Sequence, residues 1–219
     1  MKIAEAIKQM GGSGLLLAGF AVFGGLALAL THGATAEKIR EQERATLIGR
    51  LNEIVPAERY DNQPLQDVIQ LRNAEVFGTD DPVTVYRARR DGKPVAAMLT
   101  TVAPDGYNGA IRLLVGVNFD GRLAGVRVVN HRETPGLGDK IELSRSNWVR
   151  RFTGLWLGNP PENRWKVRKD GGDFDQFAGA TITPRAVVAA VKRTLAYAVS
   201  HRDELFAPAA TTTATAPAN

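Results

Sequence analysis

The sequence contains no cysteine among its 219 residues. Disulfide bonds, thiolate-held iron–sulfur clusters, cysteine–flavin bonds and c-type haem attachment are therefore excluded. Histidine is also scarce, and the scattered His32, His131 and His201 do not have the spacing of a metal site. No G-x-G-x-x-G motif opens a strand–helix unit, so nothing indicates a nicotinamide-binding site. A redox role for this chain would need another organic cofactor.

Neither sign of charge dominates the sequence. Lysine and arginine total 28 against 23 acidic residues, which gives a formal net charge of +5, and the basic residues are dispersed. Aromatic residues make up 7% of the chain and do not alternate with basic ones, so nucleic-acid binding is not expected. The length fits one globular domain with attached segments.

Charged residues are missing between Lys8 and Glu37. Within this run, residues 11–30 are apolar and long enough, at ~1.5 Å per residue, to cross a ~30 Å hydrocarbon layer. We therefore expect a transmembrane helix in the lipid bilayer, with glycines that allow a neighbouring helix to approach closely. Because Lys2 and Lys8 precede it, residues 1–10 are expected in the cytoplasm and the rest of the chain outside the membrane.

A cleaved signal peptide is the alternative for this segment. Residues 34–36, Ala-Thr-Ala, resemble an A-x-A cleavage site. However, the apolar run of residues 15–30 already exceeds a usual signal-peptide core and begins earlier still. A retained membrane anchor is the favoured interpretation.

Residues 57–206 are expected to form an α+β domain with a mainly antiparallel sheet and flanking helices. Asp91-Gly92 and Asp120-Gly121 are pairs typical of tight hairpin turns. The strands around these turns are predicted at residues 84–89, 95–102, 111–119 and 123–130.

The remaining elements are mostly helical. A charged juxtamembrane helix is expected at residues 31–56, where Pro56 stops it. The other predicted elements are short helices at 65–71 and 146–152, a strand at 165–168 and a last helix at 185–206. Residues 207–219 form a low-complexity tail of alanine, threonine and proline, which is expected to be disordered.

Residues 175–185 carry the clearest functional signal. Pro184 is typical of the start of a helix, and Thr183 before it supplies an oxygen suited to an N-cap. Thr181 then lies on a loop of small residues, near unpaired N–H groups and the positive end of a helix dipole. That is a favourable place for a phosphate. From the residues alone, a capped turn is the simpler explanation.

The same stretch resembles the flavinylation motif of the FMN-binding family. That motif is Asp, two variable residues, Ser or Thr, Gly, Ala and the modified Thr. Asp175, Gly179, Ala180 and Thr181 match it, while Ala178 departs at the Ser/Thr position. The resemblance implies covalent FMN as a phosphoester on Thr181, with Asp175 recognised by a separate flavin transferase.

Three further stretches, residues 103–111, 131–141 and 169–172, resemble the G subunits of Rnf (also called Rsx) ion-translocating electron transport complexes. The C subunit of the sodium-pumping quinone reductase shares the flavin motif and is the alternative. The resemblance implies an electron carrier in the bacterial inner membrane, with its domain in the periplasm and the other proteins of the complex as partners. Such complexes couple electron transfer between ferredoxin and NAD to movement of Na⁺ or H⁺.

The resemblance also implies which residues surround the flavin. Residues 133–138 are expected against the isoalloxazine ring, Lys169 near the phosphate, and Tyr107 in contact with the ring or with another protein of the complex. From pattern alone, the first is a Pro-Gly turn and Lys169 a surface charge. The expected cofactor-binding residues are Glu133, Thr134, Pro135, Gly136, Leu137, Gly138, Lys169, Gly179, Ala180, Thr181 and Thr183.

No catalytic or metal-binding residues are expected. Two other functions stay open: a periplasmic binding or assembly module whose Thr181 is never modified, and a free-standing flavoenzyme. A threonine hydroxyl without an adjacent general base is a poor nucleophile, so attachment of FMN would require the transferase.

Overall fold

The computed structural model describes residues 2–208. The chain divides into two compact units, Met1–Gly49 and Arg50–Asn219, and each is described by itself. Most of the tail expected at residues 207–219 lies outside the described residues.

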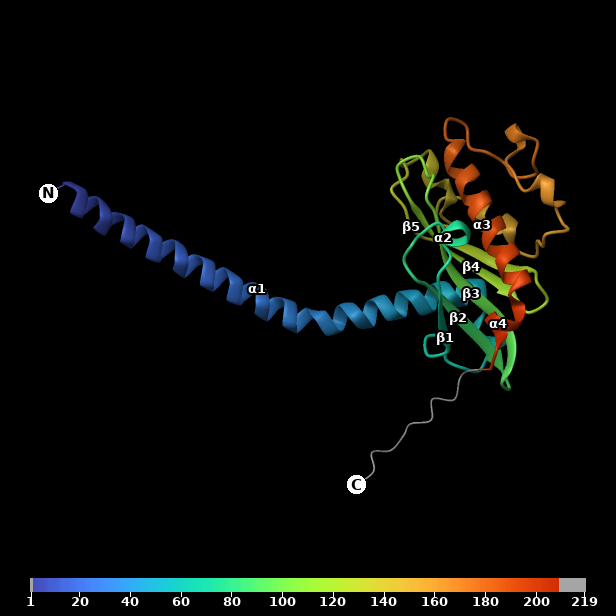
Figure 1. The fold of residues 1–219 in the computed structure, drawn as a ribbon, viewed down its shortest axis with the longest axis horizontal. Helices are drawn as coiled ribbons and strands as arrows, with labels where there is room; N and C mark the ends of the chain where they lie inside the picture. The colour runs from blue at the N-terminus through green and yellow to red at the C-terminus, as the bar shows by residue number, and fades with distance from the viewer. Residues whose placement is uncertain (1, 209–219) are drawn as a thin grey trace, which may run out of the picture. The chain divides into compact units, whose positions relative to one another are not determined.

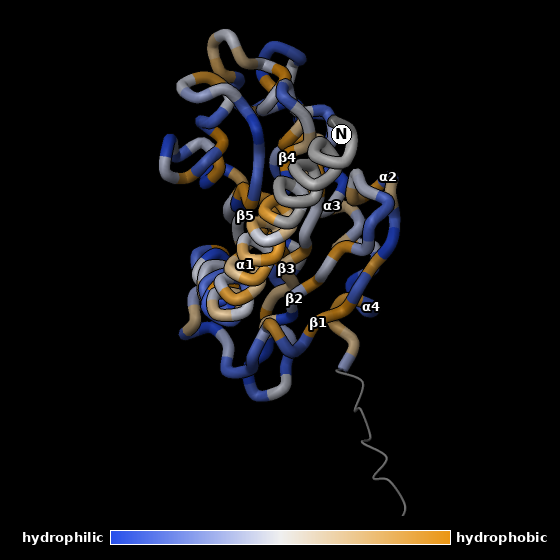
Figure 2. The backbone as a smooth tube through the Cα atoms, turned by 90° about the vertical axis from the view of Figure 1, so that its left-hand side faces the viewer, coloured by the Kyte–Doolittle hydropathy of each residue, from blue (hydrophilic) through white to orange (hydrophobic). Residues whose placement is uncertain are grey.

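A single helix, α1 (Lys2–Ile54), makes up the first unit and extends into the second. The helices expected at residues 11–30 and 31–56 are therefore one. The chain between them contains no proline, and Thr31 and Thr35 donate their hydroxyls to carbonyls one turn earlier, Ala27 O at 2.5 Å and Thr31 O at 2.7 Å. By length and composition, the part from Leu16 onward is apolar enough to cross a membrane. Figure 2 shows this apolar stretch in orange.

The second unit is built on a five-stranded antiparallel sheet in which each strand pairs with its neighbour along the chain (Figure 1). The four predicted strands and both hairpin turns are confirmed, and Asp91 and Gly92 have the positive φ values, 51° and 72°, that such a turn requires. The strands are β1 (Val68–Leu71), β2 (Val83–Arg90), β3 (Lys93–Ala103), β4 (Ile111–Asn118) and β5 (Leu123–Asn130).

The helix predicted at residues 65–71 is wrong, because part of this segment is the edge strand β1. Val68 pairs with Tyr86 of β2, and the Gln70 side chain donates to Thr84 Oγ1 across the strands at 3.0 Å. The short helix of this region lies just beyond, as α2 (Ala74–Phe77), where Asn73 caps it by accepting a hydrogen bond from Val76 N.

The main core lies between the sheet and helix α3 (Ile182–Ser200), which crosses one face of it in Figure 1. The apolar face predicted for this helix is confirmed, since Val187, Val188, Val191, Leu195 and Ala198 are all buried. The predicted last helix is two helices, however. α3 ends at Ser200, whose hydroxyl bonds back to Ala196 O, and α4 (Arg202–Phe206) follows.

The last turn of α1 packs on the sheet. Ile54 lies against β4 and β5 at Gly116 and Gly125, where a Cβ on Gly116 would overlap Ile54 Cγ2. Arg127 of β5 donates to Glu53 Oε2 at 2.7 Å. These contacts tie the end of the helix to the sheet, within the compact unit that begins at Arg50.

Residues 131–181 form no strand, and their regular structure consists of four short 3₁₀ helices. The helix predicted at residues 146–152 is present as the 3₁₀ helix η3 (Trp148–Phe152). The strand predicted at 165–168 is wrong, because Val167 makes only an isolated bridge to Phe174. The other three are η2 (Gly138–Ile141), η4 (Glu162–Arg164) and η5 (Arg168–Asp170).

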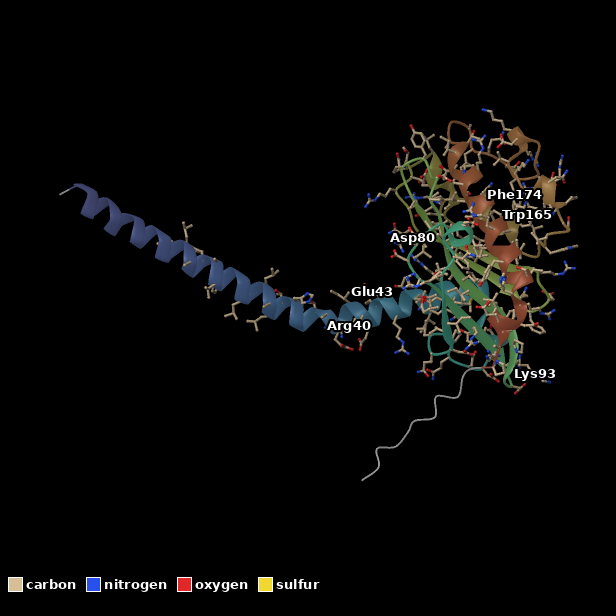
Figure 3. The ribbon with its side chains drawn as sticks, in the orientation of Figure 1. Arg40, Glu43, Asp80, Lys93, Trp165 and Phe174 are labelled. Atoms are coloured by element: carbon tan, nitrogen blue, oxygen red, sulfur yellow. The ribbon has the colours of Figure 1, made fainter. Side chains whose placement is uncertain are left out.

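An aromatic cluster stabilises this irregular region. Phe152 is its centre, with ring centroids 4.9 Å from Phe174, 5.4 Å from Trp148 and 6.5 Å from Trp165. Trp148 also packs edge-on against Phe177 at 5.3 Å. Figure 3 labels Trp165 and Phe174, neighbours within the cluster. Burial of these rings extends the hydrophobic core of the domain into the loops before α3.

Candidate functional site

The loop that enters α3 presents Thr181 as the N-cap residue. The helix begins at Ile182, and the Thr181 side chain makes no capping hydrogen bond. Its carbonyl accepts a bond from Arg185 N at 3.3 Å, while its hydroxyl has no hydrogen-bond partner among residues 2–208. Because the side chain is only half-buried, this hydroxyl is accessible to a modifying enzyme.

Backbone N–H groups are also free at this end of α3. Those of Thr181, Ile182 and Thr183 have no acceptor within the described part of the chain, and Pro184 has no N–H. Unpaired N–H groups and the helix dipole together favour an anion. A phosphate on Thr181 would find these donors without displacing an existing hydrogen bond, so the residues fit a phosphate-linked cofactor.

The N-cap role predicted for Thr183 is wrong, because the helix starts before it and Pro184 occupies the third helical position. Proline tolerates any place in the first turn, since N–H groups there lack helical acceptors. Thr183 is fully buried, and its hydroxyl donates to Glu133 Oε2. The two threonines therefore differ as expected in one respect: the Thr183 hydroxyl is hydrogen-bonded, whereas the Thr181 hydroxyl has no partner within residues 2–208.

The Glu133 carboxylate joins three segments of the site. Glu133 is only 5% exposed. Oε2 accepts the bond from Thr183, and Oε1 accepts one from Asn108 N at 3.1 Å. A Cβ on Gly138 would lie 2.6 Å from Glu133 Oε2 and 2.9 Å from Thr183 Oγ1, so only glycine fits there.

Residues 134–138 form a tight turn next to the Thr181 loop. Thr134 O accepts bonds from Leu137 N and Gly138 N, both at 3.1 Å. Pro135, Gly136 and Leu137 are exposed on this turn. Leu137 adjoins Gly179, since a Cβ there would lie 3.8 Å from Leu137 Cδ2. The fold thus brings together the two segments in which the sequence placed most of the site.

Apolar side chains are exposed on both of these segments. Leu137 is 42% exposed and Ile182, immediately after Thr181, is 44% exposed. Tyr107 is 65% exposed and precedes Asn108, whose side chain donates to Thr134 Oγ1 at 3.0 Å. Exposed apolar groups beside the free Thr181 hydroxyl are a surface on which a flat aromatic ring can rest.

Asp175 anchors the start of the loop. Its carboxylate pairs with Arg151 and with Arg168, whose Nε lies 3.0 Å from Oδ1. Its carbonyl accepts a hydrogen bond from Trp148 Nε1 at 2.8 Å. Further along, Ala180 N donates to Phe177 O at 3.1 Å, and Gly179 adopts a φ of 78° that L-residues disfavour. These contacts tie the loop to the aromatic cluster.

Lys169 lies on a turn that is fastened to α3. Arg185, in the first turn of the helix, donates to both carboxylate oxygens of Asp170 at 2.6 and 2.8 Å. The Arg185 hydrogen bond lowers the pKa of the Asp170 carboxyl, and the charges of Lys169 and Lys166 act in the same direction. Basic groups therefore gather near the start of α3, although Lys169 itself is exposed.

Two supporting residues had not been singled out from the sequence, Asn108 and His131. His131 Nδ1 accepts a bond from Glu133 N at 3.0 Å, and its Nε2 lies 2.8 Å from Glu142 Oε1. Nε2 therefore carries the proton, and this hydrogen bond lowers the pKa of Glu142. Their position in the sequence could have indicated them, because both residues lie in stretches that carried the family resemblance.

Comparisons with known proteins agree with this geometry. A family model described as the FMN-binding domain matches residues 106–196, and one described as the RnfG N-terminal region matches residues 1–54. The G subunit of the ion-translocating oxidoreductase complex of Shewanella amazonensis is 52% identical over 194 residues, which are 89% of this chain and 90% of that protein. Its counterpart in Vibrio cholerae O395 is 50% identical over 88% of this chain and 92% of that protein. For Shewanella oneidensis the identity is 48%, over 89% and 92%.

The chain belongs to the RnfG family. The resemblance seen in the sequence is thereby confirmed, in favour of the Rnf complex over the quinone reductase. The FMN-binding match spans Asn108, the Glu133 segment, the Thr181 loop and most of α3, which are the segments that the Glu133 carboxylate joins. The RnfG N-terminal match ends at residue 54, where α1 also ends.

Proposed function

We propose that this protein is the electron-carrying G subunit of an Rnf-type complex in the bacterial inner membrane, with FMN joined to Thr181 through its phosphate. Membership of the RnfG family and the FMN-binding domain support the electron-transfer role. The observation that carries the attachment site is the free Thr181 hydroxyl beside unpaired N–H groups at the start of α3.

Attachment is a phosphoryl transfer that uses FAD as the donor. A bond forms between Thr181 Oγ1 and the phosphorus of the FMN half. The bond from that phosphorus to the bridging oxygen breaks, AMP leaves with this oxygen, and the hydroxyl proton passes to a base. No side chain among residues 2–208 hydrogen-bonds to the Thr181 hydroxyl as a base would. The base is therefore assigned to a separate flavin transferase, which is thus a partner.

Each part of the site has a physical role in holding the cofactor. The free N–H groups of α3 bind the phosphate, and Lys169 adds a positive charge on the turn that the Arg185–Asp170 pair ties to this helix. The exposed turn at residues 134–137 and Ile182 offer packing surface for the ring. The bound flavin supplies the one- and two-electron chemistry, and the protein supplies position and electrostatics.

The membrane anchor determines where this chemistry takes place. Lys2 and Lys8 keep the N-terminus in the cytoplasm, α1 crosses the bilayer uncleaved, and the flavin domain lies in the periplasm. A covalent bond is useful there because a lost cofactor cannot be replaced from the cytoplasmic pool. Anchoring also keeps the flavin within reach of the other proteins of the complex, which couple ferredoxin and NAD redox chemistry to Na⁺ or H⁺ movement.

Mass spectrometry of the denatured full-length protein tests the attachment. Protein made together with the transferase should carry the mass of FMN less one water, and Thr181→Ala should lose it. Thr183→Val is the matched control, since it removes the buried hydroxyl and leaves Thr181 in place. Flavin retained by Thr181→Ala refutes the assignment. A flavin-free wild-type protein would instead indicate an assembly or binding module.

Two further experiments test location and type of function. Protease added to spheroplasts should digest the domain and leave a short membrane-bound N-terminal fragment. A mature protein that begins at Glu37, or a domain protected until the inner membrane is broken, contradicts the topology. Rapid turnover of a soluble substrate by the isolated protein would indicate a free-standing flavoenzyme.

A further inference from the structure

We infer that Glu133 is a positioning residue that also lowers the redox potential of the flavin. Its buried carboxylate holds together three segments of the site, at Asn108, Gly138 and Thr183. It also places a negative charge beneath the surface that carries Thr181. This inference rests on the proposed function, because it concerns the cofactor carried by Thr181. It assigns the carboxylate a place beneath the flavin-bearing surface instead of a direct contact with the ring.

The hydrogen bonds around Glu133 fit an ionised carboxylate. Both oxygens are acceptors, one from the Asn108 N–H at 3.1 Å and the other from the Thr183 hydroxyl. An ionised carboxylate has only acceptor sites, so this arrangement satisfies it. Within residues 2–208, no lysine, arginine or histidine forms an ion pair with it. The charge is offset instead by these two donors and by the positive end of the α3 dipole.

The carboxylate cannot move away from this position. A Cβ on Gly106 would lie 3.0 Å from Glu133 Oε1, and a Cβ on Gly138 would lie 2.6 Å from Oε2. The backbone therefore closes on the side chain from both sides, at the two places where glycine allows it. On the third side the backbone of Glu133 itself is held by His131 Nδ1 at 3.0 Å.

The Glu133 carboxylate lies close to Thr181 because its direct neighbours belong to the same loop and helix start. Its Oε2 bonds to Thr183, which is two residues from Thr181 along the first turn of α3. Its other neighbour, Gly138, follows Leu137, which adjoins Gly179 of the same loop. A buried negative charge interacts more strongly than an exposed one because water screens it less. It disfavours the addition of electrons to a nearby group, so its removal should make the flavin easier to reduce.

The test compares full-length flavinylated protein with Glu133→Gln, which keeps the size and one acceptor oxygen but removes the charge. Asp105→Asn is the matched control, because it removes an exposed charge from the turn that precedes Asn108. Mass spectrometry measures the covalent occupancy of all three proteins, and the potentials are compared on the flavinylated fraction of each. The midpoint potential should rise in Glu133→Gln, so that at a fixed applied potential the ratio of reduced to oxidised flavin increases severalfold. In Asp105→Asn the rise should be smaller. An equal shift in both, or none, overturns the inference.

Thr183→Val separates charge from geometry. It removes the hydroxyl donor but keeps the carboxylate, so the potential should rise by less than in Glu133→Gln. A rise equal to that of Glu133→Gln would show that loop geometry alone sets the potential, and the charge argument would fail.

Amide hydrogen exchange of Asn108 gives a flavin-free measurement of the positioning role. Exchange should become faster in Glu133→Ala, which has no acceptor for that N–H, and stay slower in Glu133→Gln. If Glu133→Ala does not fold, Glu133→Gln and Thr183→Val still decide between the outcomes. A wild-type protein without flavin refutes the proposed function, whereas flavinylated variants with the wild-type potential refute only this inference.

Discussion

Replacing Gly138 with alanine tests the enclosure of Glu133 most directly. The added Cβ would lie 2.6 Å from Glu133 Oε2, 2.9 Å from Glu133 Cβ and 2.9 Å from Thr183 Oγ1. Real Cβ atoms do not approach other heavy atoms so closely, so a neighbour must move. Glu133 cannot retreat without losing its bond from Asn108 N, and Thr183 lies on the fully packed side of α3.

The expected cost follows from overpacking. Extra methyl groups forced into a closed site cost about 1–3 kcal/mol. For a domain of this size, each 1 kcal/mol lowers Tm by about 2–4 °C. A cost of ~2 kcal/mol therefore corresponds to a fall of about 4–8 °C. Backbone conformation does not add to this cost, because Gly138 is not among the glycines with positive φ.

Thermal unfolding of the full-length protein in detergent measures the effect. Gly49→Ala is the control, because nothing lies within 4 Å of a Cβ there and alanine is the better helix former by ~1 kcal/mol. The cost of Gly138→Ala should shrink in part when it is combined with Glu133→Ala, since the 2.6 Å contact with Oε2 is then removed while those with Glu133 Cβ and Thr183 Oγ1 remain. A Gly138→Ala protein that melts with the wild type, or a cost independent of Glu133, would refute the described packing.

Three other substitutions test separate parts of the fold by the same measurement. Gly116→Ala should cost about 1–3 kcal/mol, because its Cβ overlaps Ile54 at the end of α1. Phe152→Ala should cost about 3–5 kcal/mol, since this fully buried ring is the centre of the aromatic cluster. Glu142→Gln should lower stability at neutral pH. The His131 hydrogen bond lowers the Glu142 pKa in the folded state, so its contribution is complete above the ordinary value of 4.5 and is lost as pH falls through the lower folded value. The difference in Tm from the wild type should therefore close in acid.

Local signals were sufficient to predict most of the sheet and the buried face of α3. Asp91-Gly92 and Asp120-Gly121 fix hairpin turns through their own backbone preferences, and α3 repeats its apolar residues at helical spacing. β1 carries no such signal, because four residues at a sheet edge adopt their conformation by pairing with β2. The start of α3 was misplaced because a first-turn proline does not distinguish between the early helical positions.

The residues of the candidate site could be named from the sequence, whereas the hydrogen bonds that connect them could not. The motif at Asp175 and Thr181 and the segment at residues 133–138 could be named from sequence resemblance. The role of Glu133 in joining these segments could not be predicted. It depends on hydrogen bonds to Asn108 and Thr183, which lie 25 and 50 positions away along the chain. The irregular region before α3 has no regular spacing of apolar residues, because it is stabilised by ring contacts between positions distant in sequence, such as Trp148 with Phe177 and Phe152 with Phe174.

The free N-terminus of α3 leads to a last prediction. A threonine at an N-cap ordinarily bonds to an N–H of the first turn, which stabilises a helix by about 0.5–2 kcal/mol. Thr181 does not do so, and its φ and ψ, −71° and −29°, are helical instead of extended. A phosphate on this residue would serve as the missing acceptor and place negative charge at the positive end of the dipole. An anion in that position contributes about 0.3–1 kcal/mol, and up to ~2 kcal/mol when partly buried.

Flavinylated protein should therefore unfold at a higher temperature than the same protein made without the transferase. Thr181→Ala, prepared with and without the enzyme, should show no difference, which controls for effects of the expression host. The gain should shrink as salt is added, because the charge–dipole part of it is screened while ring packing is not. An identical Tm for modified and unmodified wild type would mean that the phosphate does not complete the cap. A gain that salt leaves unchanged would assign the stabilisation to the ring.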